Sequence, residues 1–114
     1  MDHRLREEIL ALHANICEGL ADPTRILILY TLDESPRHVT ELASMLGISQ
    51  PTASRHLKIL RDRGMVAAER RAQAVIYSLT NRRVIEALDI LREVLADRLQ
   101  SRGDLARSVS EGVV

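Results

Sequence analysis

Apolar residues recur along both ends of the chain at the three- and four-residue spacing typical of helices. This spacing predicts a first helix over residues 3–18 and a last helix from 81 to about 101, after which Gly103 ends the helix. The apolar stripe of the first helix contains Leu5, Ile9, Leu12 and Ile16, and that of the last contains Val84, Leu88, Leu91, Leu95 and Leu99. Residues 104–114 are predicted to form a flexible tail.

A second helix is predicted from Asp22 to about Leu32, followed by a loop over residues 33–36. Asp22 is a suitable N-cap, and Pro23 fits the first turn, where its missing N–H costs nothing. Because this segment is rich in apolar residues, we expect it to be the central core element. Its expected core residues are Ile26, Leu27, Leu29 and Tyr30.

Two short helical patterns, residues 40–46 and 48–60, are separated by a turn at Gly47 and together predict a helix-turn-helix. The inward face of the second helix is predicted to contain Ala53, Leu57, Leu60 and Gly64. Its outward face carries amides, hydroxyls and cations but no acid, namely Gln50, Thr52, Ser54, Arg55 and Lys58. Such groups suit base edges and phosphates. The alternative is an amphipathic surface helix whose polar face is merely solvated.

The hydrophobic period changes after Gly64. Residues 65–71 and 74–79 are short β-prone runs around a polar turn, which predicts a two-stranded hairpin. A helix-turn-helix followed by a hairpin is a winged helix. The predicted fold class is therefore mainly α with a small β-hairpin wing, built as a single domain over residues 1–103.

Charge is unevenly distributed, although the 114-residue chain is neutral overall. Residues 37–83 hold nine Lys or Arg against three acids, a balance of +6, and the remaining residues balance this with −6. A basic middle between acidic ends is typical of a surface that binds a polyanion.

Composition narrows the function classes further. The single cysteine, Cys17, excludes an internal disulfide framework and suits a reducing compartment. No apolar run approaches membrane-spanning length and the start of the chain is not a signal peptide, so we expect a cytoplasmic protein without a membrane partner. Phosphate loops, paired metal-ligand motifs and a Ser/His/Asp constellation are also lacking, so we expect no enzyme.

Several motifs of the chain resemble those of ArsR-type bacterial transcriptional regulators. They lie between residues 16 and 80, in register and without gaps, and read LADPTRI (20–26), ELA (41–43), SQPTASRHLKILR (49–61), GMV (64–66) and YSL (77–79). The resemblance implies a homodimer in which the first and last helices pack across a two-fold axis. It also implies a repressor that releases operator DNA when a metal ion, a reactive sulfur species or an oxidant is sensed.

The apolar stripes support a dimer independently, because one small winged-helix body can cover only part of them. The predicted interface residues are Leu5, Ile9, Leu12, Ile16, Leu88, Leu91, Leu95 and Leu99. The alternative is that both stripes are fully used inside one chain. The predicted partner is double-stranded DNA, contacted by Ser49, Gln50, Thr52, Ser54, Arg55, His56, Lys58, Arg70 and Arg71. For His56, packing in a half-buried position and contact with a phosphate both remain open.

The wing departs from the family pattern. Relatives usually carry Gly then Arg at the hairpin tip, whereas this chain has Ala72 and Gln73. Loss of the glycine argues against a tight turn with positive φ. Gln73 cannot bind a phosphate by charge, so Arg70 and Arg71 remain for contacts with the DNA backbone.

Metal sites that the family commonly uses are missing. The cysteines expected near His38 are absent, and no histidine follows His56, so a zinc site on the last helix is not expected. The acidic row of Asp89, Glu93 and Asp97 suits a hard cation in principle, but a solvated face balanced by Arg92 and Arg98 is the simpler interpretation.

Cys17 and His13, four residues apart, are the remaining candidates for sensing. A thiolate and an imidazole at this spacing can bind a metal ion, and the thiol can be modified chemically. Alternatively, Cys17 is a small buried hydrophobic residue. Two other functions stay open: a winged helix that binds an acidic protein, and a regulator without an inducer of its own.

Overall fold

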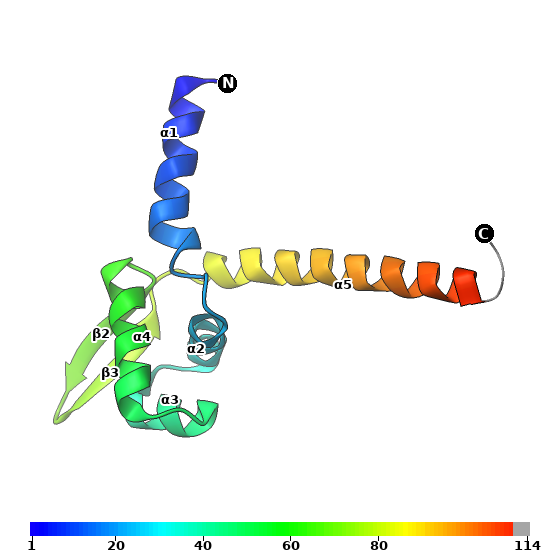
Figure 1. The fold of residues 1–114 in the computed structure, drawn as a ribbon. Coiled ribbons are helices and arrows are strands. Elements are labelled where there is room, and N and C mark those ends of the chain that lie inside the picture. The colour runs from blue at the N-terminus through cyan, green and yellow to red at the C-terminus, as the bar shows by residue number, and fades with distance from the viewer. Residues whose placement is uncertain (111–114) are drawn as a thin grey trace. The chain divides into compact units, whose positions relative to one another are not determined.

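The computed structural model describes the backbone of residues 1–110 and the side chains of residues 1–107. It contains two compact units, residues 1–82 and the segment from residue 83 onward, which we describe separately. Figure 1 shows their helices and strands. The first unit contains α1 (His3–Leu12), η1 (His13–Cys17), α2 (Pro23–Glu34), β1 (Arg37–His38), α3 (Val39–Leu46), α4 (Gln50–Asp62), β2 (Val66–Arg71) and β3 (Ala74–Leu79).

The first predicted helix is present, but its last turn is wider than an α-helix. Asp2 caps α1 by accepting a hydrogen bond from the Arg4 N–H at 3.2 Å. Over η1 the chain forms a π-helical turn, in which the Glu18 N–H donates to the His13 carbonyl at 3.0 Å. Buried glycine Gly19 follows this turn.

The predicted start of the second helix is confirmed. Asp22 is the N-cap of α2, its Oδ1 accepts from the Thr24 N–H at 2.8 Å, and Pro23 lies in the first turn. The helix is central to the core, but Leu27 was assigned wrongly, because its side chain is 53% exposed while Ile28 is fully buried.

The core of the first unit is aliphatic. Its buried residues come from α2, α3, α4, the first residue of β2 and the residue before it: Ile28, Leu29, Leu32, Leu42, Ala43, Ala53, Leu57, Leu60, Met65 and Val66. The predicted inward face of α4 is thus confirmed, except at Gly64. That glycine is exposed and follows the helix with φ +74°, so it ends α4 rather than packing beneath it.

The sheet has three strands where the sequence predicted two. β2 and β3 form the expected antiparallel hairpin, with Val66 opposite Leu79 and Arg71 opposite Ala74. β1, immediately after the predicted loop, pairs with the other edge of β3, and the strand order is β1-β3-β2. A two-residue strand carries too little periodicity to be recognised from sequence.

The second unit is one helix, α5 (Arg83–Ser110). The predicted end at Gly103 is wrong, since the helix continues through this glycine. Residues 104–110 of the predicted tail are therefore helical, and residues 111–114 lie outside the described residues. Ile85 and Leu88 are buried near the start of α5. Throughout the described part of the chain, the structure has no helix that is long and apolar enough to cross a membrane.

Candidate nucleic-acid interface

The helix-turn-helix is formed by α3, a short turn and α4, which pack against one another (Figure 1). Gly47 ends α3 in the left-handed conformation, with φ +66° and ψ +34°. Ser49 then begins α4 as its N-cap, because its Oγ accepts from the Thr52 N–H at 3.2 Å. The turn between the two helices is therefore specified by one glycine and one hydroxyl.

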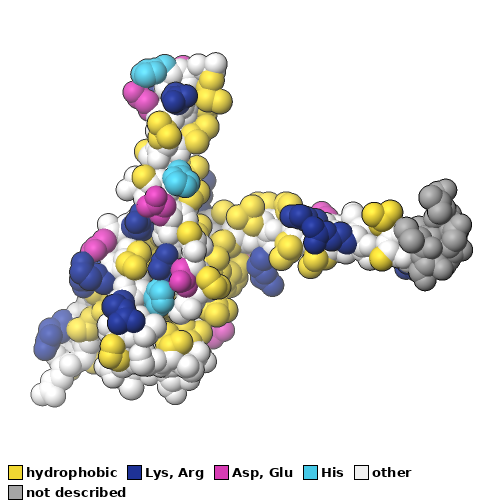
Figure 2. All heavy atoms as spheres, viewed as in Figure 1, with side chains coloured by type: hydrophobic (Ala, Val, Ile, Leu, Met, Phe, Trp, Pro, Cys, Tyr) yellow, Lys and Arg dark blue, Asp and Glu magenta, His cyan; other side chains and the backbone are white. Residues whose placement is uncertain are grey.

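The two faces of α4 are sharply different. Ala53, Leu57 and Leu60 are completely buried beneath the helix. Five of the predicted contact residues on α4 and its N-cap are exposed: Ser49, Gln50, Ser54, Arg55 and Lys58. Thr52 is half-buried. Lys and Arg side chains gather over the surface of α4 and the neighbouring hairpin in Figure 2.

The hydroxyls at the start of α4 already have partners. Ser49 Oγ donates to Thr52 Oγ1 at 2.8 Å, and Arg55 Nη2 donates to the same oxygen at 3.2 Å. This chain of hydrogen bonds holds the Arg55 guanidinium against the first turn of the helix. The arrangement restricts a long cationic side chain that the sequence predicted as a DNA contact.

The cationic face also contains an acid that the sequence interpretation missed. Lys58 Nζ donates to Asp62 Oδ2 at 2.8 Å, and both side chains are more than half exposed. This hydrogen bond lowers the pKa of the Asp62 carboxyl below its ordinary value of 3.8. The (i, i+4) spacing of the two residues could have revealed this pair from sequence.

His56 lies half-buried on the flank of α4. Its Nδ1 is 3.2 Å from Arg25 Nη1 of α2. A guanidinium has donors only, so the imidazole nitrogen must accept this hydrogen bond. Packing between helices, the first of the two roles considered for His56, is therefore observed.

The tip of the wing is a tight turn, contrary to expectation. Ala72 and Gln73 are its two central residues, and Ala72 has φ +56° even though it is not glycine. Sheet pairing on both sides imposes this conformation. Arg70 is exposed on β2, whereas Arg71 forms an exposed ion pair with Glu69 at 3.3 Å.

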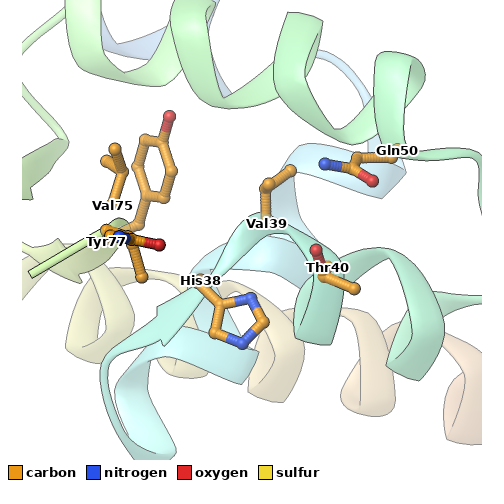
Figure 3. A pocket seen from close by; sticks show the side chains of 8 residues that line it. His38, Val39, Thr40, Gln50, Val75 and Tyr77 are labelled. Carbon is orange, nitrogen blue, oxygen red and sulfur yellow. The ribbon is translucent and has the colours of Figure 1, made fainter.

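A groove of about 390 Å³ lies between the helix-turn-helix and the wing. In Figure 3 it is surrounded by Gln50 of α4, by His38, Val39 and Thr40 at the start of α3, and by Val75 and Tyr77 of β3. Gln73 and Ala74 complete the lining. Sequence reasoning missed Thr40 and Gln73, which line this groove together with Gln50, because the groove forms only when α3, α4 and the wing are folded together.

His38 has a structural partner at this groove. Its backbone N–H donates to Glu41 Oε1 at 3.3 Å, and its side chain accepts from the Glu41 N–H, so the two residues form a capping box for α3. His38 Nε2 also lies 3.4 Å from Glu41 Oε1. These contacts give His38 a structural role at the start of α3.

The predicted interface residues of the two terminal helices are mostly uncovered in the single chain. Exposure of the predicted leucines and isoleucine is 45% for Leu5 and Ile9, 51% for Leu12, 60% for Leu91, 53% for Leu95 and 54% for Leu99. Ile16 is half-buried, and Leu88 is only 7% exposed and so belongs to the core of the chain. Sequence reasoning missed further exposed apolar residues on these helices, namely Leu10, Ile90, Val94 and Leu105.

Both candidate sensing residues, His13 and Cys17, lie in η1 and are exposed. Burial of Cys17 as a small hydrophobic residue is thus not seen in the single chain. Within the described residues, no group of three or more His, Cys, Asp or Glu side chains could hold a metal ion. In the acidic row of α5, Asp89 forms an ion pair with Arg92 at 3.2 Å, as the solvated-face interpretation expected.

Comparison with known proteins gives one consistent result. Residues 22–68 match the family model described as bacterial regulatory protein, arsR family. The chain is 43% identical to the HTH-type transcriptional repressor SmtB of Mycobacterium tuberculosis over 65% of its own length and 55% of that relative. It is 40% identical to the HTH-type transcriptional regulator Rv0081 of the same organism, over 84% of this chain and 85% of Rv0081.

Comparison with solved structures gives the same family. The crystal structure of Rv0081 matches with a TM-score of 0.73 and 40% identity, over 82% of this chain and 95% of that one. The homodimeric winged helix-turn-helix DNA-binding domain of Mb0332 from Mycobacterium bovis matches with a TM-score of 0.74 and 26% identity, over 89% of this chain and 93% of that one. The predicted winged-helix fold is confirmed.

Proposed function

The chain belongs to the ArsR family of bacterial regulatory proteins, and from this premise we propose that it is a homodimeric repressor of transcription that binds double-stranded DNA. The observation that carries the proposal is the two-faced helix α4. Its buried face is aliphatic, and its exposed face presents an amide, a hydroxyl and three cations, with Asp62 as its single acid. A regulator that binds the bacterial chromosome works in the cytoplasm, and its role is binding rather than catalysis.

Each part of the surface has a distinct role in this proposal. Gln50 and Arg55 have side chains that recognise adenine and guanine edges, respectively. Lys58, Arg70 and Arg71 supply charge for phosphates, which gives affinity without base preference. Thr40 and Gln73 line the same groove as Gln50, and we expect them to contact the strand that passes between helix and wing.

The proposed dimer allows two copies of α4 to bind one duplex. A two-fold axis would place two α4 helices about one DNA turn apart, roughly 34–36 Å, so the proposed operator is an inverted repeat. The exposed leucines of α1 and α5 supply the apolar surface for this association. The homodimer of Mb0332 supports this arrangement.

The experiment that tests DNA binding is selection of duplexes from a random-sequence library, followed by titration at several salt concentrations. The logarithm of the binding constant should fall with the logarithm of salt concentration, with a slope of about −0.9 per neutralised phosphate. Arg55→Ala should weaken binding to the selected duplex, whereas Gln50→Ala should relax base preference by about 1–3 kcal/mol. Arg102→Ala, an exposed cation of α5, is the control and should bind as the parent does. No duplex bound, or binding that ignores salt, would favour a module that binds protein.

For the inducer, we propose chemistry at Cys17, the only thiol, with His13 as its nearest candidate partner in sequence. The thiol is exposed in η1, directly after α1 and its proposed dimer contacts. A single thiol would react as a mixed disulfide or persulfide, or join its counterpart across the axis through a disulfide or a shared metal ion. Such coupling typically changes operator affinity by about 5–150-fold.

Cys17→Ser tests the inducer proposal. The variant should bind the selected duplex as tightly as the parent, and polysulfide, diamide or Zn²⁺ should release the parent but not the variant. Release of both proteins alike would place the inducer elsewhere, and release of neither would indicate a regulator without an inducer of its own.

A further inference from the structure

Two arginines join the end of the first helical segment to α4. Arg25 of α2 donates from Nε to the Gly19 carbonyl at 2.8 Å and from Nη2 to the Glu18 carbonyl at 3.2 Å. The remaining nitrogen, Nη1, lies 3.2 Å from His56 Nδ1 on α4. One guanidinium therefore connects the turn after η1 with the flank of the proposed recognition helix.

Arg63 makes a second connection from the C-cap of α4. Its Nη1 donates to the Ala14 carbonyl, and its Nη2 lies 3.4 Å from Glu18 Oε2. The Arg63 side chain is 28% exposed, so solvent competes only partly for these contacts. Hydrogen bonds from a cation are roughly twice as strong as neutral ones.

Gly19 brings the backbone of the same segment close to two side chains at and just beyond the C-cap of α4. A Cβ at this position would stand 2.2 Å from Met65 Cε and 3.0 Å from Arg63 Cδ. A larger residue here would therefore require the Met65 and Arg63 side chains to move. Residues 14–19 and α4 are thus held together by two arginines and one close approach, although more than 30 residues of sequence separate them.

We propose that Arg25 and Arg63 are positioning residues that couple residues 14–19 to the DNA-contacting face of α4. This inference rests on the proposed function. Residues 14–19 contain Cys17 and Ile16 and follow α1, so dimer packing and thiol chemistry both act on this segment. A movement of residues 14–19 would move Arg25 through its hydrogen bonds to Glu18 and Gly19. Arg25 would then move His56, which is adjacent to Arg55, and so shift the DNA-contacting face of α4.

The coupling is measured first in the DNA-free dimer, by hydrogen exchange of the amides of Glu18, Leu20 and Ala21, which are hydrogen-bonded in the structure. His56→Leu removes the acceptor for Arg25, and we expect it to speed exchange of these amides by about ten-fold or more. His56→Asn keeps an acceptor near the Nδ1 position and should restore slow exchange. Arg25→Lys preserves charge but cannot make three contacts, and should resemble His56→Leu. Arg61→Lys, an exposed position on α4, is the matched control.

A merely stabilising role predicts a different pattern. General destabilisation would speed exchange equally in the core amides of Leu29 and Leu57, whereas loss of coupling acts on residues 18–21 selectively. Equal acceleration across the core, or no difference between His56→Leu and Arg61→Lys, would overturn the proposal.

The second measurement uses the duplex selected with the parent protein. DNA binding to the parent should slow exchange in residues 18–21, because coupling is reciprocal. In Arg25→Lys the slowing should be lost while α4 is still protected, and affinity should fall about five-fold or more. Parent-like affinity and exchange in Arg25→Lys would overturn the coupling. If the parent bound no duplex but His56→Leu still accelerated residues 18–21 selectively, the DNA-binding function would be wrong and the structural coupling would stand.

Discussion

The helix-turn-helix and the two terminal helices use the same residue types at the same spacing, with opposite outcomes. Leu57 and Leu60 of α4 are completely buried, whereas Leu91, Leu95 and Leu99 of α5 are more than half exposed. On α1 no residue is buried. Helical periodicity therefore identifies an apolar face but not the surface that will cover it. Where one chain leaves such a face open over two helices, a second copy is the simplest partner.

The largest expected effect comes from placing charge on the open face. Leu91→Lys combined with Leu95→Lys should abolish the dimer, because each buried leucine contributes about 1.5–3 kcal/mol and two-fold symmetry counts each one twice. The loss is therefore about 6 kcal/mol or more. Light scattering should then show a monomer, and binding to the selected duplex should fail. Core residues such as Leu57 are untouched, so the helical circular dichroism of the folded chain should persist.

Glu93→Lys is the control for this pair. The glutamate is exposed between the two leucines in sequence, and its replacement alters charge without removing apolar surface. It should remain dimeric. A dimer of unchanged mass in the double variant would contradict the assignment of α5 to the interface.

Sequence predicted most accurately those features that depend on local geometry. The Asp22 cap, the Gly47 turn and the inward face of α4 follow from spacing and capping chemistry, and each is observed. The end of α5 was wrong because a single glycine costs a helix only about 1 kcal/mol, which a long helix can tolerate. Strand β1 and the turn at Ala72 depend on pairing with β3, which no local pattern reports.

The same distinction between local and tertiary features applies to the candidate site. Exposure of Gln50, Arg55 and Lys58 was predictable, since it follows from the helical lattice. Contact between Arg25 and His56 was not, because it joins two helices 31 positions apart. The groove beside Gln50 likewise requires the folded wing. Local sequence patterns therefore predict which side chains the recognition helix exposes, whereas the tertiary contacts that fix the position of the helix are known only from the folded structure.

Replacing Asp62 should have a smaller effect, on DNA affinity, and it compares the exposed face of α4 with α5. Asp62→Asn removes a negative charge and releases Lys58 from its ion pair, so affinity for the selected duplex should rise about two- to ten-fold, with a salt slope steeper by about 0.9. Asp104→Asn, which breaks a similar exposed pair with Arg107 on α5, should leave both values unchanged.

The pH dependence of the Asp62 pair has a definite sign. Lys58 lowers the pKa of the Asp62 carboxyl below 3.8, so the folded chain favours the ionised form. The stabilisation is present above that ordinary pKa and is lost as the pH falls through the lowered value. The unfolding free energies of the parent and Asp62→Asn should therefore converge in acid. A difference that persists well below pH 3 would show that the pair does not cause it.

The smallest expected effect lies at the wing tip. Ala72 has a positive φ at the first of two central turn positions, the pattern of a type II′ turn, which favours glycine there. Ala72→Gly relieves this strain but gives the unfolded chain more freedom, so we expect a net gain of about 0.5 kcal/mol in the free energy of unfolding. Gln73→Gly adds the same freedom without relieving a positive φ, and should lower stability by about 0.5 kcal/mol. Urea titration of both variants measures the difference. If Ala72→Gly were the less stable of the two, the tight turn would not be the conformation of the wing in solution.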